Sequence, residues 1–204
     1  MGGRYGLGLA LIAVVLAAPA LAKGDIAEEI ADGLTLTIPW VSFGAPVAMT
    51  VLGGSSTHRV GRRAADSVLG AAAVSEGLKR VVCEGRPSCP TDSRGFPSGH
   101  TAIAFALATG IGDQYRQWRT PLYAWAAAVG WSRYKLDQHF AHQVLAGALI
   151  GFTVARVSRD SHEGVCGGLF IDEDDPNGFV GPWRPGEIGL LGSDTTLWQW
   201  KMEF

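Results

Sequence analysis

Three short stretches of the chain concentrate histidines and cations, and the fold has to place them relative to one another. They read Lys-x6-Arg-Pro, Pro-Ser-Gly-His and Ser-Arg-x5-His, and they fall within about sixty residues. Their polar members are Lys79, Arg86, Ser98, His100, Ser132, Arg133 and His139. Each stretch is a weak signal alone. Together they supply three cations, two imidazoles and a glycine-opened helix start, a set that suits a phosphate group, where a protein mainly positions groups and stabilises charge.

The order and spacing of these stretches resemble the signature of the type 2 phosphatidic acid phosphatase superfamily. That family includes bacterial acid phosphatases, lipid phosphate phosphatases and vanadium haloperoxidases. The similarity runs from Lys79 to about Gly151, and it includes the 31 residues between His100 and Ser132. Many members carry an aspartate four residues after the second histidine, where this chain has Gln143. This variant is similar to the corresponding stretch of glucose-6-phosphatase, so it does not by itself indicate an inactive site.

The resemblance implies a role for both histidines. His139 would be the nucleophile and form a covalent phosphohistidine. His100 would protonate the departing oxygen and later activate the water that hydrolyses the intermediate. Gln143, one helical turn after His139, is expected to orient it by accepting a hydrogen bond from the other ring nitrogen. Because an amide is neutral, it should stabilise the developing imidazolium less than a carboxylate would.

The remaining site residues are predicted to bind the phosphate. Lys79, Arg86 and Arg133 can surround its nonbridging oxygens, with paired hydrogen bonds from the arginines. Ser98 can add a hydroxyl donor, and Gly99 lets backbone N–H groups approach an oxyanion at a helix start. Taken singly, a Ser-Gly-His sequence is commonly a helix cap and the cations could be a solvated face. Arg133 is harder to dismiss, because an unpaired charge in apolar surroundings is costly.

The first 22 residues predict a secretory signal peptide. Arg4 precedes a charge-free apolar run, and small residues up to Ala22 stand where a signal peptidase cuts. The alternative is an uncleaved membrane anchor, since the run is just long enough to span a bilayer. We favour the signal peptide and expect an exported, periplasmic protein, with membrane association left open. Its removal would leave 182 residues, a length typical of one domain.

Apolar residues at helical spacing dominate the middle of the chain and predict an all-α fold, a compact bundle of about five to six helices over residues 23–163. We expect helices over 62–82, 98–112, 120–131 and 138–157, the third with Pro121 in its first turn. Gly147 and Gly151 place small residues one turn apart, which predicts close helix contact. The charge-free segment 34–57 contains prolines and glycines, so we expect it to be irregular or packed rather than a spanning helix.

Residues 164–204 differ in composition and predict an extended C-terminal tail. The segment is rich in glycine and proline, and its end, from Trp198 to Phe204, alternates apolar and polar residues as a strand does. Three cysteines in an exported chain predict one disulfide, with the pairing among Cys83, Cys89 and Cys166 left open.

Several partner classes are disfavoured. A net charge of −2 argues against nucleic acid, which needs a basic stripe. His139 and His142 could share a helix face, but no further ligand is placed to complete a zinc site. An acidic stretch near Glu173 has Arg184 where a calcium loop needs glutamate. We therefore expect no metal or cofactor. The oligomeric state cannot be read from the sequence.

The leading hypothesis is a metal-independent histidine phosphatase that acts on phosphomonoesters, lipid phosphates or lipid pyrophosphates. One alternative is a vanadate-dependent haloperoxidase, because vanadate occupies the same kind of site. Another is a catalytically weak phosphate-binding envelope protein, if Gln143 fails to orient His139. The apolar helices favour a lipid substrate and peripheral membrane contact, whereas the lack of long spans favours a soluble phosphate ester, so the substrate stays open.

Overall fold

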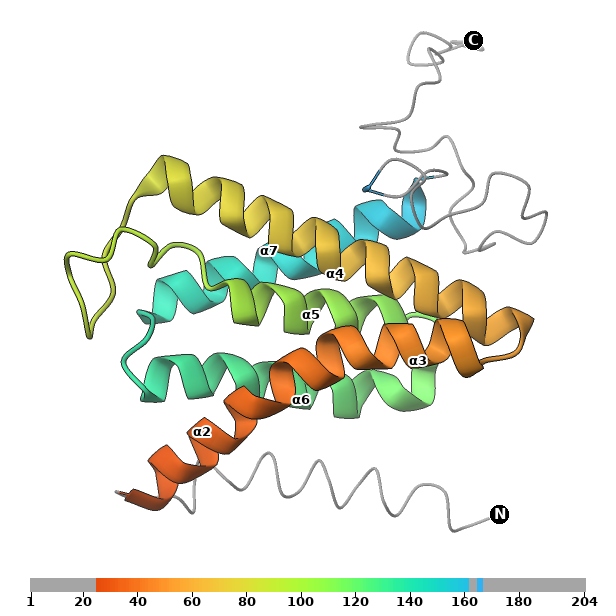
Figure 1. Cartoon of the computed structure of the whole chain (residues 1–204), viewed down its shortest axis with the longest axis horizontal. Helices are drawn as coiled ribbons and strands as arrows, with labels where there is room; N and C mark the ends of the chain where they lie inside the picture. The colour runs from red at the N-terminus through yellow and green to blue at the C-terminus, as the bar shows by residue number, and fades with distance from the viewer. Residues whose placement is uncertain (1–24, 162–164, 167–204) are drawn as a thin grey trace, which may run out of the picture.

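The computed structural model describes residues 25–161 and 165–166, and their regular structure is helical. In chain order the elements are α2 (Asp25–Pro39), the π-helical turn η1 (Trp40–Gly44), α3 (Ala45–Leu52), α4 (Ser55–Val82), α5 (Gly99–Gly112), α6 (Arg116–Lys135) and α7 (Ala141–Asp160). The expected all-α bundle is confirmed (Figure 1). The expected signal peptide and the expected strand at the C-terminus lie outside the described residues.

Helix α5 forms the centre of the bundle. It packs against α4, α6 and α7, and most of its side chains are buried. Such a helix, made largely of alanine with Ile103 and Leu107, is apolar all round and belongs in a core. Because Ser98 precedes α5 directly and His100 lies in its first turn, the core helix holds part of the second polar stretch in a fixed position.

Two glycines bring α7 against the backbone of α5. A Cβ atom on Gly147 would collide with the carbonyl oxygen of Ser98, and one on Gly151 would collide with the carbonyl oxygen of Ala102. The close helix contact expected from these glycines is confirmed. It draws the start of α7, which follows His139, to the start of α5.

Two helices begin earlier than expected. Helix α4 begins at Ser55 rather than at residue 62, and α6 begins at Arg116, so Pro121 lies inside the helix and not in its first turn. The prediction for Pro121 was therefore wrong. The tight corner between α5 and α6 explains the earlier start, because Arg119 packs over Gly112, where a Cβ would lie 3.1 Å from the Arg119 Cα.

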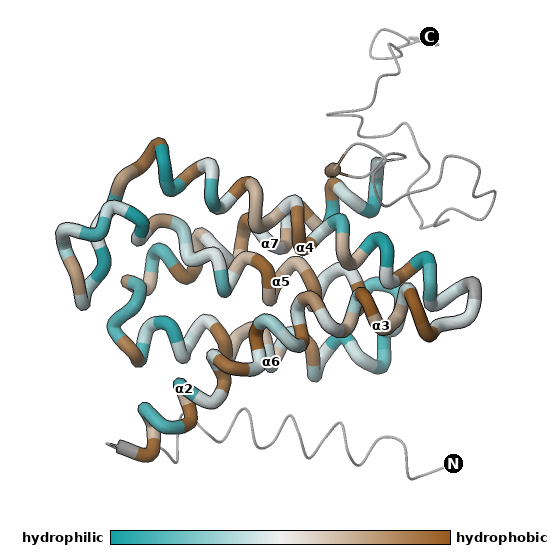
Figure 2. The backbone as a smooth tube through the Cα atoms, viewed as in Figure 1, coloured by the Kyte–Doolittle hydropathy of each residue, from teal (hydrophilic) through white to brown (hydrophobic). Residues whose placement is uncertain are grey.

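The segment 34–57 is helical, which corrects the expectation of an irregular segment. Helix α2, η1 and α3 follow one another without a break, and the chain absorbs Pro39 and Pro46 at the end of α2 and at the start of α3. By length and composition the 27 residues Ile26–Leu52 could cross a membrane, and only 17% of their most apolar window is buried. The exposed apolar side chains are Ile26, Leu36, Trp40, Phe43, Val47, Val51 and Leu52, and Figure 2 shows apolar residues along this region.

The three cysteines are free thiols in the structure, so the predicted disulfide is not formed. Each sulfur has another neighbour. Cys83 Sγ lies 3.4 Å from the carbonyl oxygen of Arg80, and Cys89 Sγ lies 3.4 Å from Thr91 Oγ1. Cys166 Sγ lies 3.8 Å from the carbonyl oxygen of Asp66, beside helix α4.

Candidate active site

The three polar stretches meet at one end of the bundle. The α4–α5 loop and the α6–α7 connection both lie at that end (Figure 1). Lys79 is in the last turn of α4, Arg86 in the loop after it, and Arg133 in the last turn of α6. The positive charges of Arg133, His139, Lys79 and Arg86 all act on the ring of His100. The fold thus gathers cations and imidazoles that are up to sixty residues apart in sequence.

Two carbonyl oxygens fix the ring of His139. Its Nδ1 lies 2.8 Å from the backbone oxygen of Gly95 and 3.1 Å from Oε1 of Gln143. Both partners only accept, so Nδ1 carries the hydrogen and Nε2 of the neutral ring carries a lone pair. The ring is almost fully buried. The expected contact between Gln143 and His139 is therefore present in the structure.

Gln143 has partners on both sides of its amide and is fully buried. Oε1 also accepts a hydrogen bond from the backbone N–H of Phe140, at 3.2 Å. Nε2 donates to Oε1 of Glu84 and to the backbone oxygen of Gly85, both at 2.9 Å. Its backbone oxygen accepts from the N–H of Ser98 at 3.0 Å. One residue thus connects the start of α7 to the start of α5 and to the end of α4.

Gly95 is a site residue that the sequence analysis missed. Its carbonyl oxygen is the nearer acceptor for His139, and its N–H donates to the backbone oxygen of Glu84 at 2.7 Å. A Cβ there would collide with the carbonyl oxygen of Gly85 and lie 2.8 Å from Nε2 of Gln143. Only glycine lets the loop approach this closely. The one sequence feature that could have indicated this position is a glycine two residues before Pro97, and it does not show which residue Gly95 contacts.

Burial and neighbouring cations keep both imidazoles neutral in the empty site. Burial, with the charges of Arg133, His139, Lys79 and Arg86, lowers the pKa of His100 to about 4. The His100 side chain still reaches solvent, so it lies at the open side of the site. Burial also lowers the pKa of His139, and the hydrogen bond to Gln143 opposes that shift. The charges that act on the ring of His100 are all positive, which favours a negatively charged ligand beside it.

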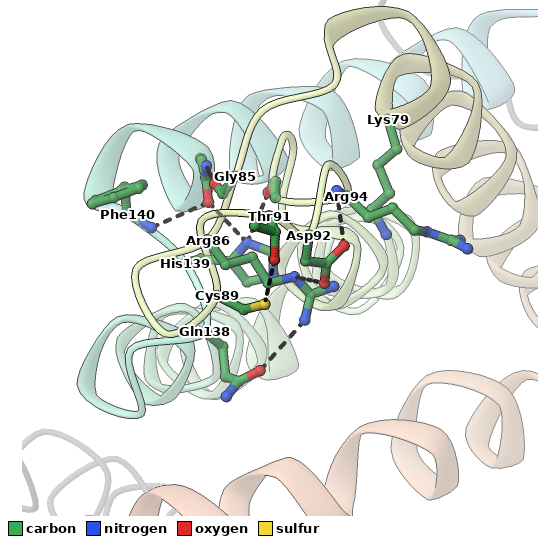
Figure 3. A network of polar contacts seen from close by, with 12 residues as sticks. Lys79, Gly85, Arg86, Cys89, Thr91, Asp92, Arg94, Gln138, His139 and Phe140 are labelled. Carbon is green, nitrogen blue, oxygen red and sulfur yellow. Dashed lines mark hydrogen bonds and ion pairs between the residues drawn. The ribbon is translucent and has the colours of Figure 1, made fainter.

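The guanidinium of Arg86 is held between two loops. Its Nε lies 3.1 Å from Oδ2 of Asp92, an ion pair without hydrogen-bond geometry, and its Nη1 donates to Oε1 of Gln138 at 3.4 Å. Figure 3 shows Arg86 between these two side chains, with His139 close by. Asp92, from the same loop as Arg86, is a second contact that sequence reasoning did not identify.

Lys79 approaches the start of α5. A Cβ on Gly99 would lie 3.3 Å from the Lys79 Nζ, so the glycine leaves room for the ammonium there. The same ammonium lies 3.6 Å from Oε2 of Glu76, and Glu76 also pairs with Arg94. Figure 3 shows Lys79 and Arg94 together on the α4 side of the site. Burial lowers the pKa of Lys79, and the charges of Arg94 and Arg86 add to the shift while Glu76 opposes it.

Ser98 and Arg133 are both buried. The Oγ of Ser98 accepts a hydrogen bond from Thr101 at 3.0 Å, so its own O–H can be offered to a ligand. Arg133 donates through Nη2 to Thr35 and, at 3.4 Å, through Nε to Oγ of Ser132. Thr35 belongs to α2, so the apolar segment made of α2, η1 and α3 contacts the site directly. No pattern in the sequence indicated this contact.

No cluster of three or more His, Cys, Asp or Glu side chains that could hold a metal ion occurs among residues 25–161 and 165–166. His142 lies next to Glu84, with Nε2 2.6 Å from its Oε1, rather than beside the ring nitrogens of His139. The calcium-loop resemblance near Glu173 lies outside the described residues.

Comparison with solved structures supports the fold. The crystal structure of Aquifex aeolicus LpxE matches with a TM-score of 0.55 and 21% sequence identity, over 77% of this chain and 97% of that one. At this identity the likeness concerns the fold alone. Among curated proteins, the lipid A 1-phosphatase of Porphyromonas gingivalis is 39% identical over 72 residues. That alignment covers 33% of this chain and 16% of the relative, so the chain spans only a small part of the relative's length.

The match to a protein-family model covers the residues of the site as well as the helices. The model of the PAP2 superfamily, the type 2 phosphatidic acid phosphatase family, matches residues 63–163. This range begins within α4, ends just after α7 and contains all three polar stretches. The helical domain of this chain therefore belongs to the PAP2 superfamily.

Proposed function

We propose that the protein is an exported, membrane-associated phosphatase that hydrolyses lipid phosphates or lipid pyrophosphates through a phosphohistidine at His139. The observation that carries this proposal is the pair of hydrogen bonds from Nδ1 of His139 to Gly95 and Gln143. They leave Nε2 free to act as a nucleophile in a site that also contains Lys79, Arg86 and Arg133. Membership of the PAP2 superfamily supports the same chemistry.

In the first step Nε2 of His139 attacks phosphorus. Binding of the dianionic phosphate offsets the cations around His100, so His100 takes up a proton with the substrate. The bond from phosphorus to the ester oxygen then breaks, its electron pair stays on that oxygen, and the proton of His100 neutralises it. Lys79, Arg86 and Arg133 balance the charge on the three nonbridging oxygens. The hydroxyl of Ser98 is placed to donate to one of them.

In the second step water replaces the histidine. His100, now neutral, accepts a proton from the water while its oxygen attacks phosphorus. The bond between Nε2 and phosphorus breaks and returns its electrons to the ring of His139. The product is inorganic phosphate, and His100 is protonated again for the next turnover.

The backbone at the start of α5 adds donors. The first N–H groups of a helix have no partner within it, and the helix dipole favours an anion there. The first bond within this helix runs from the N–H of Ala102 to the oxygen of Ser98 at 3.0 Å, so the N–H groups of residues 99–101 precede it. Lys79 lies beside the same helix start. A phosphate placed there would meet both.

An amphiphilic substrate fits the surface next to the site. Leu36 and Trp40 are 72% and 80% exposed. They lie on the same N-terminal segment as Thr35, which accepts a hydrogen bond from Arg133. Burying such side chains in lipid gains about 25 cal/mol per Å² of apolar surface, which favours contact with a bilayer. A substrate held in that bilayer would present its phosphate close to Arg133. The lipid A 1-phosphatase relative acts on a lipid phosphate, which supports the same substrate class.

Rapid-quench trapping tests the mechanism. With a 32P-labelled substrate, the protein should form an acid-labile, base-stable phosphoenzyme within the first turnover, and His139→Ala should form none. His58→Ala is a matched control, because His58 lies in the first turn of α4 and the site lies at the other end of that helix. If His139→Ala released phosphate as fast as the parent protein, the nucleophile assignment would be wrong.

A substrate panel and a fractionation test the rest. Phosphate release from phosphatidate, undecaprenyl pyrophosphate, lipid A and an aryl phosphate should be fastest with a lipid in mixed micelles. The protein should pellet with membranes after a carbonate wash and should be cleaved by protease added to spheroplasts. Peroxide-dependent halide oxidation with added vanadate, without phosphate release, would instead identify a haloperoxidase. Turnover of the aryl phosphate alone would assign a soluble substrate.

A further inference from the structure

A line of hydrogen bonds continues from His139 beyond Gln143. Nε2 of Gln143 donates to Oε1 of Glu84 at 2.9 Å, and the same Glu84 oxygen lies 2.6 Å from Nε2 of His142. The line reads His139, Gln143, Glu84, His142. It joins the start of α7 to the end of α4, where Glu84 is the second residue after the helix.

We propose that Glu84 is a positioning residue for the reaction at His139, acting through the amide of Gln143. Glu84 does not contact the imidazole of His139 or the place where a phosphate would bind. It determines which end of the amide faces His139, and it brings a negative charge to within one amide group of the ring. The inference rests on the proposed function of His139 as the nucleophile.

The orientation of the amide follows from the kinds of groups around it. An ionised carboxylate and a backbone carbonyl only accept hydrogen bonds. Oε1 of Glu84 and the oxygen of Gly85 therefore require the NH₂ end of Gln143, while the N–H of Phe140 requires its oxygen. A flipped amide would place its oxygen against two acceptors and its NH₂ group against Nδ1–H of His139. Together with Gly85 and Phe140, Glu84 thus prevents an orientation that would remove one of the two acceptors of His139.

The negative charge of Glu84 also favours the reaction at His139. When Nε2 forms a bond to phosphorus, the ring becomes cationic, and a nearby negative charge stabilises it. Gln143 is neutral, so Glu84 is the nearest carboxylate along this hydrogen-bonded line. Its side chain is 33% exposed, which means that solvent screens part of the effect. We therefore expect a moderate contribution to the rate.

His142 holds Glu84 from the other side. Its ring stacks on Phe96 and Phe140, with centroid distances of 6.4 and 5.7 Å. This packing keeps the imidazole next to Glu84, although the side chain of His142 is largely exposed. His142 thus limits the movement of the carboxylate without contacting His139.

Steady-state kinetics of three variants test the proposal. Glu84→Gln keeps the shape but removes the charge and one of the three groups that orient the amide of Gln143, and it should lower kcat about tenfold with KM within about twofold. The exchange variant Glu84→Gln with Gln143→Glu moves the charge onto the residue that contacts His139 and keeps a hydrogen bond between the two positions. It should recover kcat to within about threefold of the parent. Asp160→Asn removes the charge of a carboxylate that pairs with Arg159 at the other end of α7; it is the control and should stay within about twofold of the parent.

Three outcomes would overturn the proposal. One is a kcat for Glu84→Gln within twofold of the parent, another is an exchange variant no faster than Glu84→Gln, and the third is an equal loss in Asp160→Asn. If Glu84→Gln failed to fold, as shown by its melting curve, the exchange variant would decide. A restored kcat would support the role of Glu84, and a kcat as low as that of His139→Ala would exclude it.

A spectroscopic readout separates this inference from the proposed function. In 15N-histidine-labelled protein in detergent, the parent should show His139 as the Nδ1–H tautomer. Glu84→Gln should keep this tautomer, because the oxygen of Gly95 still accepts from Nδ1–H, but the Nδ1 resonance should shift as the hydrogen bond to Gln143 weakens. This measurement needs no turnover. A parent protein without phosphatase activity would refute the proposed function, while an unchanged Nδ1 resonance in Glu84→Gln would refute the positioning role.

Discussion

The amide oxygen of Gln143 lies 3.1 Å from Nδ1 of His139, one helical turn away across the start of α7. The backbone oxygen of Gly95 approaches the same nitrogen at 2.8 Å. Two neutral acceptors therefore fix the imidazole where many proteins of this family use a carboxylate. The arrangement sets the tautomer and the direction of the ring as firmly as an aspartate would, and the charge of the supporting network lies farther away, on Glu84.

Replacing Gln143 by alanine should destabilise the protein and slow the reaction. The side chain is fully buried and makes four hydrogen bonds, so its loss would leave the N–H of Phe140 and the oxygen of Gly85 without partners. We expect the free energy of unfolding to fall by about 2–4 kcal/mol, as measured by denaturant unfolding. Gln138→Ala, which removes only two bonds of 3.4 Å, is the control. An equal loss in both variants would contradict this account.

Acid should destabilise the folded protein through the two imidazoles of the site, whose pKa values are lowered in the folded state. Burial lowers the pKa of His100 to about 4 and also lowers the pKa of His139. An unfolded histidine has a pKa of about 6.5, so as the pH falls the unfolded chain takes up these protons first. The stability due to the neutral rings is complete above pH 6.5 and is lost as the pH falls toward 4.

Melting temperatures between pH 7.5 and 4 test this prediction. The parent should lose more than His100→Asn over this interval, and the carboxylates that titrate in both proteins cancel in the comparison. Vanadate should raise the melting temperature of the parent, because an anion offsets the cations and binds only the folded state. A decline just as steep in His100→Asn would show that His100 does not contribute.

Gly99→Ala should weaken phosphate binding without unfolding the protein. The new Cβ would lie 3.3 Å from Nζ of Lys79, and the flexible end of the lysine can move aside. The ammonium would then leave the start of α5, so KM should rise about three- to tenfold, a loss of about 1 kcal/mol of binding.

Gly77→Ala is the matched control for that substitution. Nothing lies within 4 Å of a Cβ on Gly77, in the C-terminal part of α4, so the change should leave KM unaltered. It should stabilise the helix by about 0.5–1 kcal/mol. A KM in Gly99→Ala equal to that of Gly77→Ala would show that Lys79 does not bind the substrate at the helix start.

Gly151→Ala should damage the packing of α7 on α5. Its Cβ would meet the backbone oxygen of Ala102 and lie 2.9 Å from the backbone nitrogen of Ala106, and neither backbone atom can move without shifting a helix. We expect a loss of about 1–3 kcal/mol in the free energy of unfolding, or more if the helices cannot separate. Denaturant unfolding against Gly77→Ala provides the measurement. A stability equal to that of Gly77→Ala would contradict the close contact.

Local patterns were enough to predict the helical class and most of the candidate site. Helix propensity and apolar spacing are properties of neighbouring residues, so α5 and much of α4 and α7 could be recognised directly. Spacing between the polar stretches named His100, His139 and the cations before any fold was known. Helix boundaries were less well predicted, because packing at corners, as between Gly112 and Arg119, outweighs the local preference of Pro121 for a helix start.

The sequence by itself therefore named the side chains of the candidate site, namely two imidazoles, three cations and a serine at a helix start. Tertiary structure alone decided how they are supported. The contacts of Gly95 with His139, Glu84 with Gln143, and Thr35 with Arg133 join residues that are 44, 59 and 98 positions apart. Such pairs leave no periodic trace in the chain, since hydrogen bonds between distant segments depend on helix packing and not on the neighbours of either residue.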